Sequence, residues 1–150
     1  MSLSVNRILA AADFSETSDK AFDYALSLAK VFEAEVVVLH ILQEPILYQP
    51  TTAQSYRDEF ERKMQDNLDA MLQRHTCEGV NVTTAMKQGA PFVEIIQFAE
   101  TEKCDMIVLG THGHGPIHYM LLGSVAEKVV RKAKCPVLVV RPDQHQFVSP

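Results

Sequence analysis

The sequence predicts a single α/β domain built on a parallel sheet of five strands, with helices on both faces of the sheet. The chain has 150 residues, which is the length of one domain. Short apolar runs typical of buried strands alternate with longer segments of helical periodicity along the whole chain. Five strands separated by four helices indicate parallel strands joined by helical crossovers, because a parallel neighbour can be reached only by such a connection.

The first half of the chain contains two predicted strands and two predicted helices. The apolar runs 8–12 and 36–41 are typical of buried strands. Ser15 is the expected N-cap of the first helix, whose apolar stripe is Ala21, Ala25, Leu28, Ala29 and Phe32. Residues 43–53 contain two prolines and are expected to form a loop. The second helix has a stripe that recurs every four positions and is interpreted as core: Tyr56, Phe60, Met64, Leu68 and Leu72.

The second half contains three predicted strands and two predicted helices. Residues 80–86 alternate apolar and polar side chains, which indicates a partly exposed strand at the edge of the sheet. Pro91 fits the first turn of a third helix, with the stripe Phe92, Ile95, Ile96 and Ala99. Residues 106–109 and 137–140 are apolar runs that predict two further strands. The last helix lies between them, with the stripe Val125, Ala126, Val129, Val130 and Ala133, and residues 142–150 form a short polar tail.

Composition excludes several classes of protein. With 14 Lys and Arg against 19 Asp and Glu, the net charge is −5, which disfavours a nucleic-acid binder that needs a basic face. The apolar runs are too short to span a membrane, and the first residues do not resemble a secretion signal. The three cysteines, Cys77, Cys104 and Cys135, have no CxxC spacing. Neither a disulfide framework nor a zinc ribbon is expected, and the cytoplasm is the predicted compartment.

A glycine-rich segment connects the end of the fourth strand, at Leu109, to the last helix. It contains Gly110, Gly113, Gly115 and Gly123. Glycines at such a connection allow backbone N–H groups to converge on an anion, and a helix that opens at Ser124 would attract phosphate at its N-terminus. Two interpretations remain open from the residues alone. The segment binds phosphate, or it is an ordinary loop in which residues 124–127 form a capping box.

The spacing Gly110-x2-Gly113-x9-Gly123-Ser124 resembles the nucleotide-binding motif of the universal stress protein family, of its ATP-binding kind. Three further segments resemble the family's opening loop, last helix and last strand: Asp13-Phe14-Ser15-Glu16, residues 123–129 and residues 135–140. The resemblance covers about residues 5–141. It implies a Rossmann-like open sheet of order 3-2-1-4-5 and a homodimer. It also implies binding of an adenine nucleotide, ATP or AMP, in stress response or regulation.

The resemblance also implies which residues form the site. Those of the base and ribose region are Ala11, Ala12, Asp13 and Ile41, and those of the phosphate region are Leu109, Gly110, Gly113, Gly123, Ser124 and Val125. Core packing is the alternative role for Ala11, Ala12 and Ile41. For Asp13 the alternative is a loop carboxylate that helps to cap the first helix.

Histidines cluster in the glycine-rich segment, at His112, His114 and His118. No Lys or Arg lies between Asp105 and Glu127, whereas many relatives carry a basic residue where this chain has His114. We therefore include His112 and His114 in the predicted nucleotide site and expect affinity to weaken as the pH rises through the histidine range. No metal site made of side chains alone is expected. A Mg²⁺ ion bridging the nucleotide phosphates is the expected metal.

Two other functions remain as alternatives, a weak ATP hydrolase and a nucleotide-free module that acts through protein contacts. No general base with an orienting partner can be identified, and GxGxxG and P-loop motifs are absent, which disfavours an enzyme. His40 is expected to be a partly buried structural residue at the end of the second strand, and His75 belongs to no motif. The apolar edge strand 137–141 is expected to pair with a second copy of the chain, unless the tail covers it.

Overall fold

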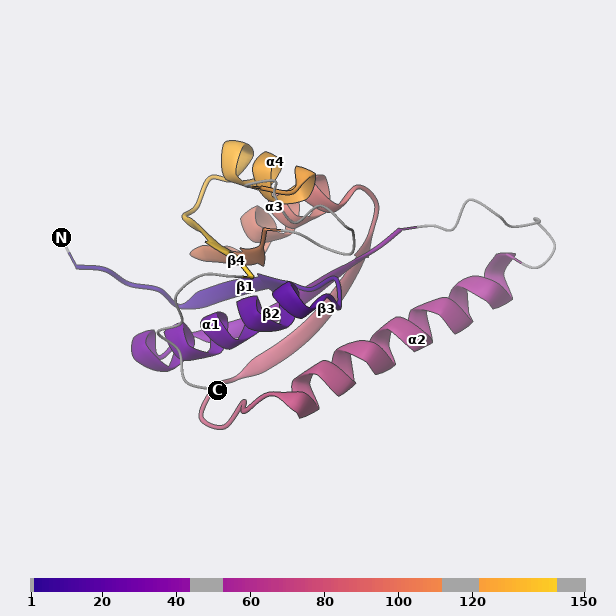
Figure 1. Ribbon diagram of the computed structural model, residues 1–150, viewed down its shortest axis with the longest axis horizontal. Helices are drawn as coiled ribbons and strands as arrows, with labels where there is room; N and C mark the ends of the chain where they lie inside the picture. The colour runs from indigo at the N-terminus through magenta and orange to yellow at the C-terminus, as the bar shows by residue number, and fades with distance from the viewer. Residues whose placement is uncertain (1, 44–52, 112–121, 143–150) are drawn as a thin grey trace.

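Figure 1 shows the computed structural model, which describes residues 2–43, 53–111 and 122–142. Its strands are β1 (Arg7–Ala11), β2 (Glu35–Leu42), β3 (Val82–Gln88), β4 (Met106–Gly110) and β5 (Val137–Val140). Its helices are α1 (Glu16–Phe32), α2 (Ala53–Arg74), α3 (Pro91–Thr101) and α4 (Ser124–Lys132). The predicted alternation of strands and helices is therefore confirmed. Of the predicted loop 43–53, Ala53 already belongs to α2, and most of the remainder lies outside the described residues.

The five strands form one parallel sheet in the order β3-β2-β1-β4-β5. This is the order that the family resemblance implied, and it places β3 at an edge, as its alternating pattern predicted. The strand begins two residues later than expected, at Val82. The preceding residues form a turn in which Gly79 has a φ of 81° and the Val80 N–H donates to the Cys77 carbonyl at 3.1 Å.

Helices cover both faces of the sheet and bury one apolar cluster on each (Figure 1). On one face, α1 and α2 enclose a cluster whose largest members include Phe22, Ile8, Leu68 and Met71. On the other face, α3 and α4 pack over the strand residues Leu9, Leu39 and Ile107, and α4 contributes Val129 to the cluster. Because neighbouring side chains of a strand point to opposite faces, each apolar strand contributes to both clusters.

Helix α2 is core in only part of its length. Leu68 and Met71 are fully buried in the cluster beneath α1. Tyr56, at the other end of the helix, is 47% exposed. The stripe predicted as core therefore packs on the sheet only through its C-terminal half, because α2 extends beyond the sheet at its N-terminal end (Figure 1). A similar difference occurs in α4, where Val130 is 45% exposed and Ala133 follows the last helical residue.

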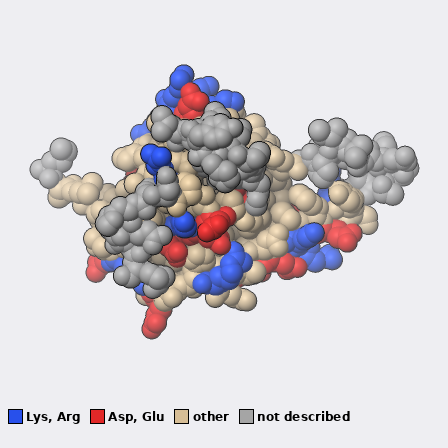
Figure 2. Space-filling view, viewed as in Figure 1, with Lys and Arg blue, Asp and Glu red and all other residues tan. Residues whose placement is uncertain are grey.

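Charged side chains of both signs are mixed over the face of the molecule shown in Figure 2. That face carries no broad basic patch among the residues that the structure describes. Within the same residues, no helix combines the length and the apolar character that crossing a membrane requires.

Candidate nucleotide-binding site

A cavity of about 580 Å³ opens at the carboxyl ends of β1, β2 and β4. Most of the predicted site residues line it: Ala11, Ala12, Asp13, Ile41, Leu109, Gly110, Gly123, Ser124 and Val125. The other predicted residues, His112, Gly113 and His114, lie outside the described residues, as does His118. Residues from four separate parts of the chain thus meet in one cavity whose volume suits a nucleotide-sized ligand.

The cavity lies where the sheet changes its winding direction. After β1 the chain turns to α1 on one face, and after β4 it leads to α4 on the opposite face. Since β1 and β4 are neighbours and the helices that follow them lie on opposite faces, the cavity opens between the starts of α1 and α4. Ligands of open α/β sheets bind at such a switch point.

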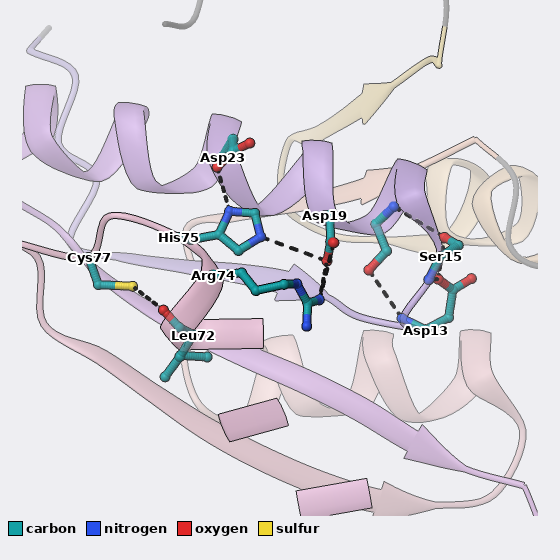
Figure 3. A network of polar contacts seen from close by, with 9 residues as sticks. Asp13, Ser15, Asp19, Asp23, Leu72, Arg74, His75 and Cys77 are labelled. Atoms are coloured by element: carbon teal, nitrogen blue, oxygen red, sulfur yellow. Dashed lines mark hydrogen bonds and ion pairs between the residues drawn. The ribbon is translucent and has the colours of Figure 1, made fainter. Parts of the chain in front are cut away.

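The loop after β1 forms its own hydrogen-bond network on one wall of the cavity (Figure 3). The Asp13 carboxylate accepts from the Ser15 N–H at 3.0 Å and from the Ser15 hydroxyl at 2.5 Å. Ser15 is the predicted N-cap, and its Oγ accepts from the Ser18 N–H at 3.2 Å. In return, the Ser18 hydroxyl accepts from the Asp13 N–H at 3.2 Å. Asp13 therefore has the capping role that we considered as an alternative, while it also lines the cavity.

The N-terminus of α4, on the facing wall, is built differently. Its N-cap is Gly123, which has no side chain and makes no side-chain capping bond. The Glu127 N–H donates to the Gly123 carbonyl at 2.9 Å, so Ser124 is already the first helical residue. The capping box considered for residues 124–127 is therefore wrong, because that motif needs its serine at the N-cap. Within the described part of the chain, the first turn of α4 thus faces the cavity without a capping side chain.

Gly110, at the end of β4, is required by close packing. A Cβ atom at this position would lie 2.6 Å from the Thr17 Cγ2 atom of α1, closer than real Cβ contacts occur. The glycine therefore allows the first turn of α1 to approach β4, and it lines the cavity at the same place. This close approach gives Gly110 a packing role that the sequence could not separate from a role in ligand binding.

His40 lies on the cavity wall inside β2, two residues before the strand ends at Leu42 rather than at its end as predicted. Its Nδ1 atom lies 2.7 Å from the Ala12 carbonyl oxygen. Since a carbonyl can only accept, Nδ1 carries the proton, and Nε2 of the neutral ring is an acceptor. The ring also packs on Phe14, with 4.5 Å between the ring centroids, and Phe14 has a positive φ of 65°.

The sequence reasoning missed the apolar wall that helices contribute to the cavity. Phe60 and Met64 come from α2, and Pro91 and Ile95 come from α3. The sequence pattern places all four residues on helices and predicts Phe60 and Met64 to be core. The i, i+4 spacing shows that they share a face of α2 but does not show where the sheet beneath that face ends. Among the described residues, no three His, Cys, Asp or Glu side chains gather as metal ligands would.

Comparison with known proteins agrees with this geometry. The family model for the universal stress protein family matches residues 4–141. A curated relative, universal stress protein MJ0531 of Methanocaldococcus jannaschii, is 36% identical over 138 residues, covering 90% of this chain and 81% of the relative.

Solved structures give the same result for the fold. Universal stress protein UspA from Lactobacillus plantarum superimposes with a TM-score of 0.80 at 27% identity, covering 93% of this chain and all of that one. A universal stress protein solved in complex with cAMP superimposes with a TM-score of 0.60 at 26% identity, covering 93% and 98%. That relative holds an adenine nucleotide on a similar fold.

Proposed function

This chain belongs to the universal stress protein family, and from that premise we propose that its large cavity binds an adenine nucleotide, ATP or AMP, in stress response or regulation. Residues 1–150 would act as one nucleotide-binding domain. The observation that carries the proposal is the pairing of two unlike walls in one cavity. One wall has the N-terminus of α4, where no described side chain forms a cap, and the other is apolar.

The α4 wall suits the phosphates. The first N–H groups of a helix have no partner within the helix, and the helix dipole makes them favourable to negative charge. Among the described residues no side chain caps them at α4, and the N-cap, Gly123, has no side chain of its own. We propose that Gly123, Ser124 and Val125 meet the phosphates, with a Mg²⁺ ion bridging the phosphate oxygens.

The opposite wall suits the base. Ile41 from β2 and the two α2 residues Phe60 and Met64 offer apolar surface to a flat aromatic ring. Asp13, Ala11 and Ala12 border the same space at the end of β1, where the ribose would lie. A nucleotide would thus span the cavity from the carboxyl ends of β1 and β2 to the start of α4.

Titration calorimetry with ATP, AMP and inorganic tripolyphosphate tests the proposal. We expect saturable binding of a nucleotide, which Phe60→Ala weakens at least several-fold because its wall of the base site is lost. Tripolyphosphate has no base, so its binding should be unchanged in this variant. Tyr56→Ala is the matched control, since Tyr56 lies one turn earlier on α2, is 47% exposed and does not line the cavity. Absence of saturable binding by the unsubstituted protein would contradict the proposed function.

The same titration tests the two predicted contributions of His114 and Mg²⁺. Affinity measured at about pH 6 and about pH 8, on either side of the ordinary histidine pKa of about 6.5, should be weaker at the higher pH if a charged imidazole contacts the phosphates. Equal affinity would remove His114 from that role. A chelator that removes Mg²⁺ should weaken the binding of ATP. It should leave the binding of AMP, which has a single phosphate, unaffected.

We also propose that β5 pairs with β5 of a second copy to form a homodimer. The strand lies at the edge of the sheet and is apolar throughout. The Pro136 carbonyl accepts from the Ile107 N–H, and the Val140 carbonyl accepts from the Thr111 N–H. Because successive residues of a strand direct their backbone groups to opposite sides, the N–H groups of Val137 and Val139 point away from β4. Val139→Pro removes one outward donor and leaves the β4 ladder intact. Sedimentation should show a dimer for the unsubstituted chain and a monomer for this variant.

The cytoplasm is the compartment that we propose. All three cysteines are free, which fits a reducing environment. Fractionation of cells that produce the chain tests this assignment.

A further inference from the structure

A second cavity, of about 160 Å³, lies at the opposite end of the sheet from the nucleotide site, where β4 and β5 begin. Two cysteines line it, Cys104 from the connection between α3 and β4 and Cys135 from the connection between α4 and β5. Apolar side chains such as Ala99 and Ile107 form the rest of its inner wall. An ion pair between Lys134 and Glu100, with 3.4 Å between the Nζ and Oε1 atoms, stands at its rim.

The backbone holds the two cysteines at the entrances of neighbouring strands. The Cys104 N–H donates to the Ala99 carbonyl at 2.8 Å, which anchors it to the end of α3 after a left-handed residue, Lys103. Cys135 directly precedes Pro136, whose carbonyl accepts from the Ile107 N–H at 3.0 Å. The register pairs Ile107 with Val137, so Cys104 and Cys135 are one residue out of step, as diagonal neighbours. With strands about 4.8 Å apart and a rise of about 3.3 Å per residue, such neighbours lie about 6 Å apart. That separation falls within the roughly 4.4–6.8 Å between the Cα atoms of disulfide-bonded cysteines.

Both thiols belong to the same side of the sheet. Cys104 is a buried member of the cluster beneath α3 and α4, and Cys135 packs against that cluster while remaining partly exposed. Cys77, the third cysteine, packs against the cluster on the opposite face. The chain therefore contains one pair of cysteines that share a cavity and one cysteine that is separated from them by the sheet.

We propose that Cys104 and Cys135 form a redox dithiol that closes to a disulfide when a hydroperoxide reaches the partly exposed Cys135. The Cys135 thiolate attacks one oxygen of the hydroperoxide, and the O–O bond breaks. This step yields a sulfenic acid at Cys135 and releases water or an alcohol, which takes the thiol proton. Cys104 then attacks the sulfenic sulfur, the S–S bond forms, and the S–O bond breaks with loss of water. Two thiols lose two electrons, and the hydroperoxide gains them.

The electrostatics make this reaction slow at neutral pH. Burial raises the pKa of the Cys104 thiol to about 11, with a smaller opposing effect of Arg7 and a further increase from the neighbouring Cys135. Burial also raises the pKa of Cys135. Because the thiolate is the nucleophile, the rate of closure should increase about ten-fold per pH unit well below these pKa values. The two cysteines should therefore form a disulfide during sustained exposure to a hydroperoxide rather than during a brief one.

The disulfide would connect residues on either side of the segment that carries the proposed phosphate site. The loop between Cys104 and Cys135 includes β4, the glycine-rich segment and α4. Closing this loop restricts the unfolded chain, which stabilises the folded protein. The oxidised protein should therefore have a higher Tm than the reduced protein, with unchanged secondary structure.

Peptide mapping after treatment with hydrogen peroxide and alkylation of the remaining thiols tests the proposal. We expect a peptide pair linked between Cys104 and Cys135, two hydrogens lighter than the reduced pair, while Cys77 remains alkylated as an internal control. Formation should be faster at about pH 9 than at about pH 7. Oxidation of Cys135 to a sulfinic or sulfonic acid without a link, or a link between two chains, would overturn the proposal.

A second measurement reports the proximity of the thiols without any oxidation. Phenylarsine oxide bridges two thiols that lie side by side, so the reduced protein and its Cys77→Ser variant should each bind one equivalent tightly. Cys135→Ser should lose this binding, and circular dichroism checks that the variant is folded. Failure of the reduced unsubstituted protein to retain the reagent would overturn the proposal even if a substituted chain did not fold. Neither measurement uses a nucleotide, so its outcome is independent of the function proposed above.

Discussion

The N-termini of α1 and α4 border the same cavity but are completed in different ways. At α1 the Ser15 side chain caps the helix, and the Asp13 carboxylate in turn accepts two hydrogen bonds from Ser15. At α4 the N-cap is Gly123, with no capping side chain. Both helices follow a strand of the same parallel sheet, so the difference comes from the residues at the two connections.

This comparison indicates which wall is structural and which is available to a ligand. The first turn of α1 is satisfied by its own loop and packs tightly against Gly110. The first turn of α4 presents backbone donors to the cavity, and no described side chain caps them. Substitutions near α1 should therefore change mainly the free energy of unfolding, whereas those at α4 should change mainly nucleotide affinity.

The largest effect on stability is expected from Gly110→Ala. The new Cβ would lie 2.6 Å from the Thr17 Cγ2 atom, so α1 must shift. Overpacking of this kind typically costs about 1–3 kcal/mol of unfolding free energy, which urea denaturation measures. Thr17→Ser removes the clashing methyl group, so the double variant should recover part of the loss. Strictly additive effects would show that the contact does not limit the packing of α1.

A comparable loss, this time in affinity, is expected from Gly123→Asp. The carboxylate would cap α4 and bring negative charge to the proposed phosphate site. We expect ATP affinity to fall at least about ten-fold, equivalent to about 1.4 kcal/mol, while the unfolding free energy stays equal or rises by a few tenths of a kcal/mol. Titration calorimetry and denaturation measure the two quantities. Gly123→Asn is the matched control for size without charge and should lose less affinity.

A smaller loss of stability is expected from Ser15→Ala. This change removes the acceptor of the Ser18 N–H and should cost about 1 kcal/mol of unfolding free energy. Ser15→Thr retains the hydroxyl and should cost less. If Ser15→Ala left stability unchanged, α1 would not depend on its cap, and the contrast between the two helices would disappear.

The smallest effect is expected where α2 contacts the first turn of α1. Arg74 donates to both oxygens of Asp19, at 3.2 and 3.1 Å, but its side chain is 51% exposed (Figure 3). Exposed pairs contribute about 0.2–1 kcal/mol, so Arg74→Gln should cost no more than this. The difference should shrink further in about 1 M salt, where the Debye length is about 3 Å. A larger, salt-independent loss would show that α1 depends on α2 as well as on its own loop.

The sequence predicted the elements of the fold well where a local signal existed. Ser15 identified the start of α1, Pro91 the start of α3, and the alternation near Val82 the edge strand, because each depends on residues close in the chain. Ser124 was correctly predicted as the start of α4, but the cap of this helix was not predictable. The spacing of Ser124 and Glu127 also fits a capping box, in which Ser124 would be the N-cap and the helix would begin one residue later, whereas the N-cap is Gly123.

The candidate site was only partly predictable. The residues after β1 and β4 could be found because a parallel sheet brings the carboxyl ends of its strands together. Phe60 and Met64 could not, since their spacing on α2 is the same whether they face the core or a cavity. Leu68 and Met71 are buried on the sheet, and this packing decides where along α2 the apolar face passes from core to cavity wall.

By itself, the sequence determined the order of strands and helices, the edge strand and the segments that carry the glycines, because these follow from local periodicity and backbone preference. Only the tertiary structure decided that α2 forms a wall of the large cavity, that Thr17 packs against Gly110, and that Cys104 and Cys135 share a cavity. Each of these depends on how closely residues distant in the chain approach one another, and local patterns contain no information about that distance.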